Sequence, residues 1–582
     1  MKHRLYFLIL LCTLVLFPGC SRNDARQPGQ EAEARPPENI SISLTASESA
    51  YLENLRRNGG LKVATLLYPG AYERDASGRE RGFHYRMIQA LGDMLDMPVS
   101  VRFVNFDDAF TENGVIPPEV KTDPEVEYTP DLLKQVDIFA FDLTEVPWRS
   151  KLMTIIPLVP TRVLVVNRRG EEVAYLGQFQ NKRFTIYRNT SHEIFLENIE
   201  KRLGIPIEII PVEFGEDRSQ LLQSDEADFI ITDSQTSVIE ISRNNDLNIS
   251  FALTDIEMNG WAVSKINTTL ASILRKFFDQ ARSSGILDEA WQEGYGVSLD
   301  RYYNLIGYPQ STVLTFDDEE KGYIESLEKR GGMRIAIGDV TSVYEENENG
   351  TIGGLHYYLA LEIAHVLGVP VRFRPVSFYE FFEKDGEVPE LVKTDPGYYY
   401  TPDLLGEADL FISTFSPLPW RKKFLDFIEL YPTKKVFVTR KDFRKVTLAD
   451  LKDLKISILT DTSYEAFLRK HYDLSDVSVI FTQTAEDAVR MVSAGRTDIT
   501  IEDASTLITR LKKYRNLTFY PADDTVEMLS WALARDNQLL ERVLIKTIAY
   551  LRSTGRFDVI WKDYYGITFN EYLDLISYRG SE

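Results

Sequence analysis

VKTDPGYYYTPDLLGEADLFISTFSPLPWRKKFLDF, residues 392–427, aligns without a gap with VKTDPEVEYTPDLLKQVDIFAFDLTEVPWRSKLMTI, residues 120–155, and repeats VKTDP, YTPDLL and PWR unchanged. Lys121, Trp148 and Arg149 each recur 272 positions further along the chain. Internal self-similarity takes precedence over any local structure prediction, because it fixes the architecture. A repeat of this length indicates a whole domain in two tandem copies.

Both copies show the same succession of expected elements. LTASESAYLENLRRNGGLKVAT from Leu44 and TFDDEEKGYIESLEKRGGMRIAI from Thr315 each predict a capped helix, a Gly-Gly stop and a short strand. A second helix and a second strand follow, and strand, helix and strand in this order are typical of a parallel α/β fold. We expect domains at 44–312 and 313–582, separated near YPQSTV.

The first 43 residues are expected to lie outside these domains. A short basic start and an apolar run too short to span a bilayer predict a signal peptide over residues 1–20. The run closes on LFPGC, which resembles a bacterial lipobox and implies lipidation of Cys20, with an ordinary cleaved signal as the alternative. Residues 21–43 are polar and rich in Pro, Gly and Glu, which predicts a flexible tether.

Composition limits the partners and the location. The formal net charge of −22 argues against nucleic acid or an anionic membrane surface as a partner. Cys12 and Cys20 are the two cysteines, so a chain processed at Cys20 has no internal disulfide. We expect the folded part on the periplasmic face of a bacterial membrane, held by lipid only, with the outer membrane favoured in a Gram-negative host.

ISTFSPLPWRKK (412–423) and the runs GRTDITIED and EADFIITD resemble the family 3 extracellular solute-binding proteins, the type II periplasmic receptors for amino acids. The resemblance occurs twice and covers residues 47–578. It implies an α/β fold with two tandem bilobal domains, each holding a ligand between its lobes. The helix starts and Glu-rich capping helices also resemble the sensor domains of hybrid histidine kinases and of lytic murein transglycosylase F.

The resemblance also implies ligand-binding residues. The family's carboxylate-clamping arginine corresponds to Arg421 and Arg149, and its ammonium-binding acid to Asp503 and Asp233. Hydroxyl donors and cleft aromatics complete the expected set: Ser413, Thr414, Ser416, Ser463 and Tyr344 in the second copy, and Thr144, Ser191 and Tyr72 in the first.

Each of these assignments has a structural alternative. The arginines could pair with a neighbouring carboxylate, the two aspartates could cap the helices that follow them, and the two tyrosines could pack in the core. Asp142 stands where the second copy has Thr414, and a carboxylate beside the clamp would repel an anionic ligand. The first cleft is therefore expected to be altered or silent.

No catalytic or metal motif appears, so we expect a non-enzyme without cofactor or metal. His84 and His356 recur at equivalent positions, and packed helix-start histidines are the expected interpretation. The leading hypothesis is a receptor for an amino acid or similar small zwitterion that serves a transporter permease or a sensor protein. The alternatives are a non-catalytic, muropeptide-binding regulator of the cell wall and a divergent dehydratase.

Overall fold

The structure is a computed structural model and describes residues 42–577 apart from 76, 122, 124, 189, 214, 215 and 311. The expected signal peptide, Cys20 and the tether up to residue 41 lie outside the described residues. In the first copy, helical and strand elements run from Ala46 to Ile306, and in the second from Asp318 to Ser577. The predicted boundary at 312 and 313 falls between these two sets and stays a prediction.

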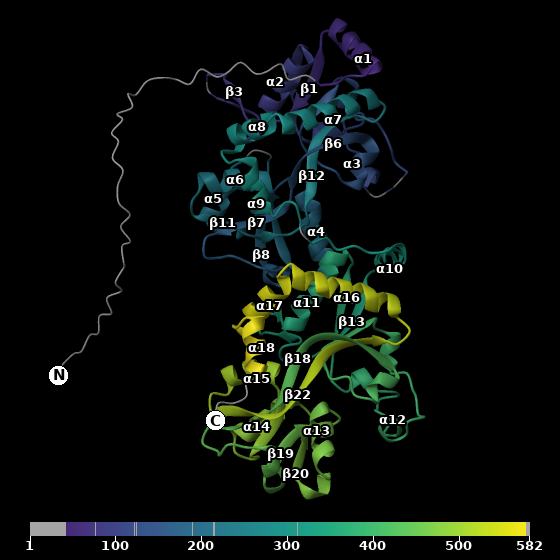
Figure 1. Ribbon diagram of the computed structural model, residues 1–582, viewed down its shortest axis with the longest axis vertical. Helices are drawn as coiled ribbons and strands as arrows, with labels where there is room; N and C mark the ends of the chain where they lie inside the picture. The colour runs from purple at the N-terminus through teal and green to yellow at the C-terminus, as the bar shows by residue number, and fades with distance from the viewer. Residues whose placement is uncertain are drawn as a thin grey trace, which may run out of the picture. The chain divides into compact units, whose positions relative to one another are not determined.

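Two five-stranded sheets form the first copy (Figure 1). The first-lobe sheet has the order β4-β1-β5-β12-β6, with β1 parallel to β4 and β5 and with β12 antiparallel to its neighbours. The second-lobe sheet has the order β11-β7-β10-β8-β9. The strands are β1 (Leu61–Thr65), β4 (Val99–Phe103), β5 (Ile138–Thr144), β6 (Met153–Thr161), β7 (Val163–Arg168), β8 (Lys182–Tyr187), β9 (Ile207–Val212), β10 (Phe229–Asp233), β11 (Leu247–Ala252) and β12 (Glu257–Ser264).

The second copy has one eight-stranded sheet of order β16-β13-β17-β22-β18-β21-β19-β20. Two long strands run through both lobes, so the two halves of this sheet are continuous. The strands are β13 (Met333–Gly338), β16 (Val371–Val376), β17 (Leu410–Phe415), β18 (Leu425–Arg440), β19 (Lys455–Leu459), β20 (Ser478–Thr482), β21 (Ile499–Asp503) and β22 (Leu517–Ala534). Small hairpins β2–β3 (Glu73–Arg74, Glu80–Arg81) and β14–β15 (Glu345–Glu346, Ile352–Gly353) precede one helix in each copy.

Helices of equivalent position accompany the sheets. In the first copy they are α1 (Ala46–Arg57), α2 (Phe83–Leu95), α3 (Pro147–Leu152), α4 (Ser191–Leu203), α5 (Ser219–Gln223), α6 (Ser234–Arg243), α7 (Thr268–Ser283), α8 (Ile286–Tyr295) and α9 (Leu299–Ile306). In the second they are α10 (Asp318–Lys329), α11 (Leu355–Leu367), α12 (Leu391–Thr394), α13 (Ser463–His471), α14 (Ala485–Ser493), α15 (Ala504–Lys513), α16 (Gln538–Ser553), α17 (Arg556–Tyr565) and α18 (Phe569–Ser577).

The predicted helix starts have the expected caps. Thr45 begins α1 and Asp317 begins α10, and each forms a capping box with the glutamate three residues later. His84 and His356 lie buried in the first turns of α2 and α11. Trp indole N–H groups donate to the Nδ1 atoms of both rings at 3.0 and 2.8 Å, and burial lowers the pKa of His356 to about 3.

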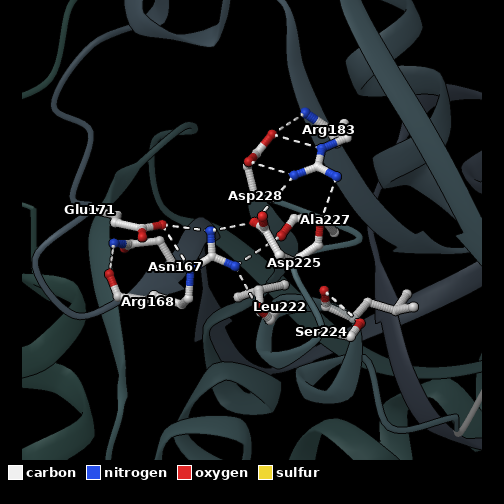
Figure 2. A network of polar contacts seen from close by, with 10 residues as sticks. Asn167, Arg168, Glu171, Arg183, Leu222, Ser224, Asp225, Ala227 and Asp228 are labelled. Carbon is white, nitrogen blue, oxygen red and sulfur yellow. Dashed lines mark hydrogen bonds and ion pairs between the residues drawn. The ribbon is translucent and has the colours of Figure 1, made fainter.

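One aspartate anchors the start of a strand in each lobe. Its carboxylate accepts the backbone N–H of the first or second residue of the neighbouring strand at 2.8 Å; the four pairs are Asp137–Lys62, Asp228–Arg183, Asp409–Arg334 and Asp498–Lys455. In the second lobe of the first copy the anchor extends into a charged network, in which Arg183 also contacts Asp228 at 3.1 Å and Arg168 contacts Asp225 at 3.1 Å (Figure 2). These contacts bind β7 and β8 to the loop before β10.

The architecture confirms the expected α/β class with two tandem bilobal domains. The chain crosses between the lobes of the first copy from β6 to β7 and returns from β11 to β12, and in the second copy along β18 and β22. Apolar residues on the inner faces of the sheets and helices form the cores, including Trp261 and Trp531 at full burial. Within the described residues, no helix combines the length and the apolar character needed to cross a bilayer.

Candidate functional site

Each copy contains a cavity lined by residues of both its lobes. The cavity of the second copy measures about 490 Å³ and that of the first about 110 Å³. In the second copy the first lobe contributes Asp339, Phe378, Tyr379, Ser413, Thr414, Ser416 and Arg421, and the second lobe Thr462, Ser463, Tyr464, Thr484, Glu486, Glu502, Asp503, Thr506 and Arg510. The second cleft is therefore the roomier of the two.

Arg421 is a buried cation in the wall of the second cleft. It is 1% exposed, and its guanidinium lies over the rings of Phe378, Phe382 and Trp420 at 4.6 to 5.3 Å. Nη1 donates to the carbonyl of Ser416 and Nη2 to that of Asp461, both at 3.0 Å. Burial lowers the pKa of Arg421 to about 9, while the charge of Asp461 acts in the opposite direction. Within the described residues it makes no ion pair, and Nε has no hydrogen-bond partner.

Asp503 lies across this cleft at the end of β21. It accepts a hydrogen bond from the Tyr464 hydroxyl at 3.0 Å, and its other oxygen has no hydrogen-bond partner among the described residues. Asp503 occupies the N-cap position of α15 but makes no side-chain capping bond, so the structure does not support the capping alternative. Burial raises its pKa, and Lys435 opposes that shift.

Lys435 is the nearest cation to Asp503. Its ammonium is 3.9 Å from Asp503, 2.7 Å from Glu527 and 3.1 Å from the Ser463 hydroxyl. Glu527 also accepts a hydrogen bond from Ser416 at 3.2 Å. Two of the predicted hydroxyl donors, Ser416 and Ser463, are therefore engaged in the Lys435–Glu527 pair.

Ser413 and Thr414 lie at the end of β17 and line the cavity as expected, with Ser413 buried. Glu502 of β21 lines the same cavity from the other lobe. Burial raises the pKa of Glu502 to about 7, against the attraction of Arg510. Arg510 itself is paired with Glu486.

The Lys-Thr-Asp-Pro segment lies at the rim of the second cleft. Lys393 of this segment belongs to the first lobe and pairs at 2.6 Å with Asp461, which belongs to the second lobe. Lys423 donates to the carbonyls of Val392 and Asp395 and so holds the segment in place. The two lobes are thus linked by Lys393 and by Arg421, both of which contact Asp461.

Arg149 occupies the equivalent place in the first cleft. It is 3% exposed, lies over the rings of Phe106, Phe110 and Trp148, and donates to the carbonyl of Thr144 at 3.2 Å. Burial lowers its pKa to about 10, with Asp233 and Glu257 acting in the opposite direction. Like Arg421, it makes no ion pair with any described residue.

Asp233 and Ser191 line the first cavity together with Thr144. Asp233 begins α6 without a side-chain capping bond and lies 3.3 Å from Nε2 of His192. The Thr144 hydroxyl is turned to Asn259, to which it donates at 2.9 Å. Burial, followed by the charge of Asp233, raises the pKa of Glu257 to about 6.

Asp142, expected to repel an anion, has its own partners. The Tyr68 hydroxyl donates to it at 2.6 Å, and Nε2 of His84 lies 3.4 Å away. Burial acts to raise the pKa of Asp142, but His84, Tyr68 and Gln235 outweigh this effect and hold it below its ordinary value. The carboxylate of Asp142 therefore interacts mainly with Tyr68 and His84 of its own lobe.

Tyr72 and Tyr344 are not among the described residues that line the cavities. Tyr72 is 1% exposed and donates to Glu80 at 2.9 Å, while Tyr344 packs edge-on against Tyr357. These contacts fit the core-packing alternative, because both rings are enclosed by their own lobe.

Several lining residues were not anticipated from the sequence: His192, Arg218 and Glu240 in the first cleft, and Glu502 and Arg510 in the second. Lys435 and Glu527, also not anticipated, line a neighbouring cavity behind the second cleft. His192 and Tyr464 directly follow the predicted Ser191 and Ser463 in the sequence, and this adjacency could have indicated that they lie near the clefts. Lys435 had a weaker signal, a lysine within an apolar strand. In the part of the chain that is described, no three His, Cys, Asp or Glu side chains are grouped as metal ligands.

Comparison with known proteins finds curated relatives, among them the following two. The chain is 25% identical over 287 residues to the membrane-bound lytic murein transglycosylase F of Idiomarina loihiensis. This alignment covers 47% of this chain and 56% of that protein. The chain is 27% identical over 165 residues to the amino-acid-binding protein AabA of Dichelobacter nodosus, covering 28% of this chain and 65% of that protein. The chain thus spans less than two thirds of either relative. No protein-family model matches it.

Among solved structures, the periplasmic domain of BvgS from B. pertussis aligns with 94% of this chain and 98% of its own, at 15% identity and a TM-score of 0.42. The two bilobal copies agree with the fold expected from the resemblance to solute-binding proteins. The chain is homologous to an amino-acid-binding protein and to lytic transglycosylase F, and each of its two copies has the type II periplasmic-binding-protein fold.

Proposed function

We propose that the protein is an exported, lipid-anchored receptor that binds a small carboxylate-bearing solute, an amino acid or a close analogue, between the lobes of each copy. Binding would close the cleft by hinge motion and serve transport or sensing. Cys20 would carry the lipid, and the folded part would lie on the periplasmic face of the membrane. A permease or a sensor protein would be the partner.

The observation that carries this proposal is a buried guanidinium without a counter-ion in each cleft. Arg421 and Arg149 are at most 3% exposed and make no ion pair with any described residue. A buried cation is costly unless it is paired. A bound anion would supply the missing partner, and the planar guanidinium matches the two oxygens of a carboxylate.

The surroundings of Arg421 suit a small ligand. Phe378 and Tyr379 provide apolar walls, while Ser413, Thr414 and Asp503 provide polar contacts. A few polar groups in a mainly apolar, preformed cavity are typical of small-molecule sites. Homology to an amino-acid-binding protein supports the same class of ligand.

Homology to lytic transglycosylase F favours a second candidate, a non-catalytic regulator that binds muropeptides. The second cavity, at about 490 Å³, has room for a ligand larger than an amino acid. The two candidates share the carboxylate, because muropeptides also carry this group.

A thermal-shift screen of the full chain against amino acids, short peptides and muropeptides tests the proposal. A solute at one hundred times its Kd is expected to stabilise the protein by about 2.7 kcal/mol. Arg421→Met and Arg149→Met should each abolish the contribution of one cleft, because truncating one partner of a buried charge pair costs about 2–5 kcal/mol.

Lys422→Met is the matched control, since Lys422 is the exposed neighbour of Arg421. It should leave the shift unchanged. If muropeptides stabilise the parent and no amino acid or peptide does, the regulator takes the place of the receptor. If every shift survives both arginine substitutions, the carboxylate clamp is wrong.

A further inference from the structure

The two clefts differ by one buried cation at a structurally equivalent position. In the second copy Lys435 of β18 is the direct antiparallel partner of Asp503 in β21. In the first copy Val163 of β7 is the direct partner of Asp233 in β10. Side chains of directly opposite residues lie on the same face of a sheet, so a lysine and a valine occupy the same place beside the same aspartate.

A second carboxylate is also equivalent in the two clefts. Glu527 is paired in register with Thr433, and Glu257 with Thr161. Both copies therefore place an aspartate and a glutamate at equivalent strand positions near the cleft. The lysine is present in only one of them.

Lys435 lies behind the wall of the second cleft, where it lines a neighbouring cavity together with Ser463 and Glu527. Its side chain is 3% exposed, and its ammonium contacts Glu527 at 2.7 Å and Ser463 at 3.1 Å. It stands 3.9 Å from Asp503, close enough to offset the charge of that carboxylate. Asp503, which would attract the ammonium group of a ligand, thus already has the ammonium group of Lys435 beside it.

The first cleft has no lysine beside its aspartate. Asp233 has His192 at 3.3 Å and makes no ion pair with a lysine or arginine among the described residues. Asp142 adds a further carboxylate to this cavity, where the second copy has Thr414. Arg218 and Arg243 also line the first cavity, but they pair with Glu240 and Glu73. Asp233 is therefore left without a lysine or arginine partner among the described residues.

We propose that Lys435 replaces the ammonium group of a ligand, so that the second cleft selects small carboxylates without an ammonium group and the first selects solutes that carry both. This proposal rests on the proposed function, because it assumes that Arg421 and Arg149 hold the ligand carboxylate. It assigns Lys435 as the residue that determines specificity. It also reverses the expectation that the first cleft is silent.

Paired ligands test this directly. Each amino acid is compared with the analogue in which hydrogen replaces the ammonium group: L-phenylalanine with hydrocinnamate, L-leucine with isocaproate, and L-glutamine with glutaramate. Calorimetry on the full-length Arg149→Met variant reports on the second cleft, and on Arg421→Met on the first. For the pair that binds most tightly to the second cleft, we expect the affinity for the desamino acid to be at least tenfold higher than that for the amino acid. For the pair that binds most tightly to the first cleft, we expect the amino acid to have the higher affinity.

Substitution at the two equivalent positions provides the controls. Val163→Lys, made in the Arg421→Met background, should turn the preference of the first cleft toward the desamino acid. Lys435→Met, made in the Arg149→Met background, should turn the second toward the amino acid. Because Lys435→Met also leaves two carboxylates unpaired, the Val163→Lys graft is the decisive variant.

The outcomes separate the two proposals. If the second cleft binds the amino acid of a pair as tightly as the desamino acid, the role of Lys435 is wrong and the receptor function stands. If Val163→Lys binds ligand with an unchanged preference, the role of Lys435 is likewise wrong. If no member of any pair binds either cleft, the receptor function fails, and the specificity proposal fails with it.

Discussion

The two clefts share an arginine, an aspartate and a glutamate at equivalent positions, yet their electrostatics differ. In the second cleft Lys435 is paired with Glu527, whereas in the first Val163 leaves the equivalent Glu257 without a lysine. The comparison shows that duplicated sites can retain a buried arginine and differ by one charged residue behind the wall. If Lys435 acts as we propose, the charge of the ligand is set by a residue that does not line the cavity.

The hinges differ as well. In the second copy β18 and β22 pass between the lobes as unbroken strands, while in the first copy each is divided in two. Arg162 lies at one of these breaks and donates to the carbonyls of Thr254 and Ile306 at 2.9 and 3.2 Å. In the second copy the two strands themselves continue through the hinge, although their pairing shifts in register between Lys434 and Val436.

A buried ion pair is reversed between the copies. Arg218 comes just before α5 and pairs at 2.5 Å with Glu240 of α6, whereas in the second copy the glutamate, Glu486, is on α14 and the arginine, Arg510, on α15. Each pair joins the helix that follows β10 or β21 to the residues at the start of the helix that precedes the same strand. Both copies have an ion pair at this place, but the arginine and the glutamate have exchanged positions.

Arg218→Met is expected to have the largest effect, a loss of about 3–5 kcal/mol in the free energy of unfolding, because it leaves Glu240 buried without a cation. Burial already raises the pKa of Glu240, and one of its oxygens has no partner among the described residues. Arg510→Met should cost less, since Glu486 keeps Lys513 and Tyr514 at 2.5 Å. Urea unfolding of both variants measures the difference, and equal losses would contradict it.

Glu502→Gln is expected to stabilise the second copy by up to about 3 kcal/mol at pH 8 and not at pH 4. Burial raises the pKa of Glu502 to about 7, so the folded state binds more protons than the unfolded state between pH 4.5 and 7. Stability therefore falls as pH rises through this range, and glutamine removes the fall. Urea midpoints at the two pH values measure it; a gain of the same size at pH 4 would show a different cause.

Glu257→Gln should produce the smallest effect, a gain of up to about 2 kcal/mol at pH 7.5 that vanishes near pH 4. Burial and the charge of Asp233 raise the pKa of Glu257 to about 6, so stability is lost as pH rises from 4.5 to 6. Glu527→Gln is the matched control. It should destabilise at pH 7.5, because it leaves Lys435 without its nearest carboxylate. Thermal melts across this pH range would refute the comparison if both variants changed in the same direction.

The fold was predictable because its signals are local and occur twice. The Gly pairs, the capping residues at Thr45 and Asp317 and the alternation of helix and strand each depend on neighbours within a few residues. Duplication doubled each signal. The position of Arg421 after a Ser/Thr turn belongs to the same class, and the arginine does line a cleft.

Other residues could not be placed by pattern. Tyr72 and Tyr344 stand in equivalent places in both copies, yet each packs within its own lobe. A repeated aromatic residue is equally compatible with a core and with a cleft, because both environments favour a large apolar ring. The two alternatives can be separated only by the neighbours that surround the ring.

The sequence by itself determined the duplication, the α/β class, the order of the elements and the positions of the arginines and aspartates. The tertiary structure alone placed Lys435 opposite Asp503 and beside Glu527, residues 68 and 92 positions away in the chain. Strand register decides such contacts, and register is set by the packing of whole sheets. For this reason the charge of each cleft appears only in the folded protein.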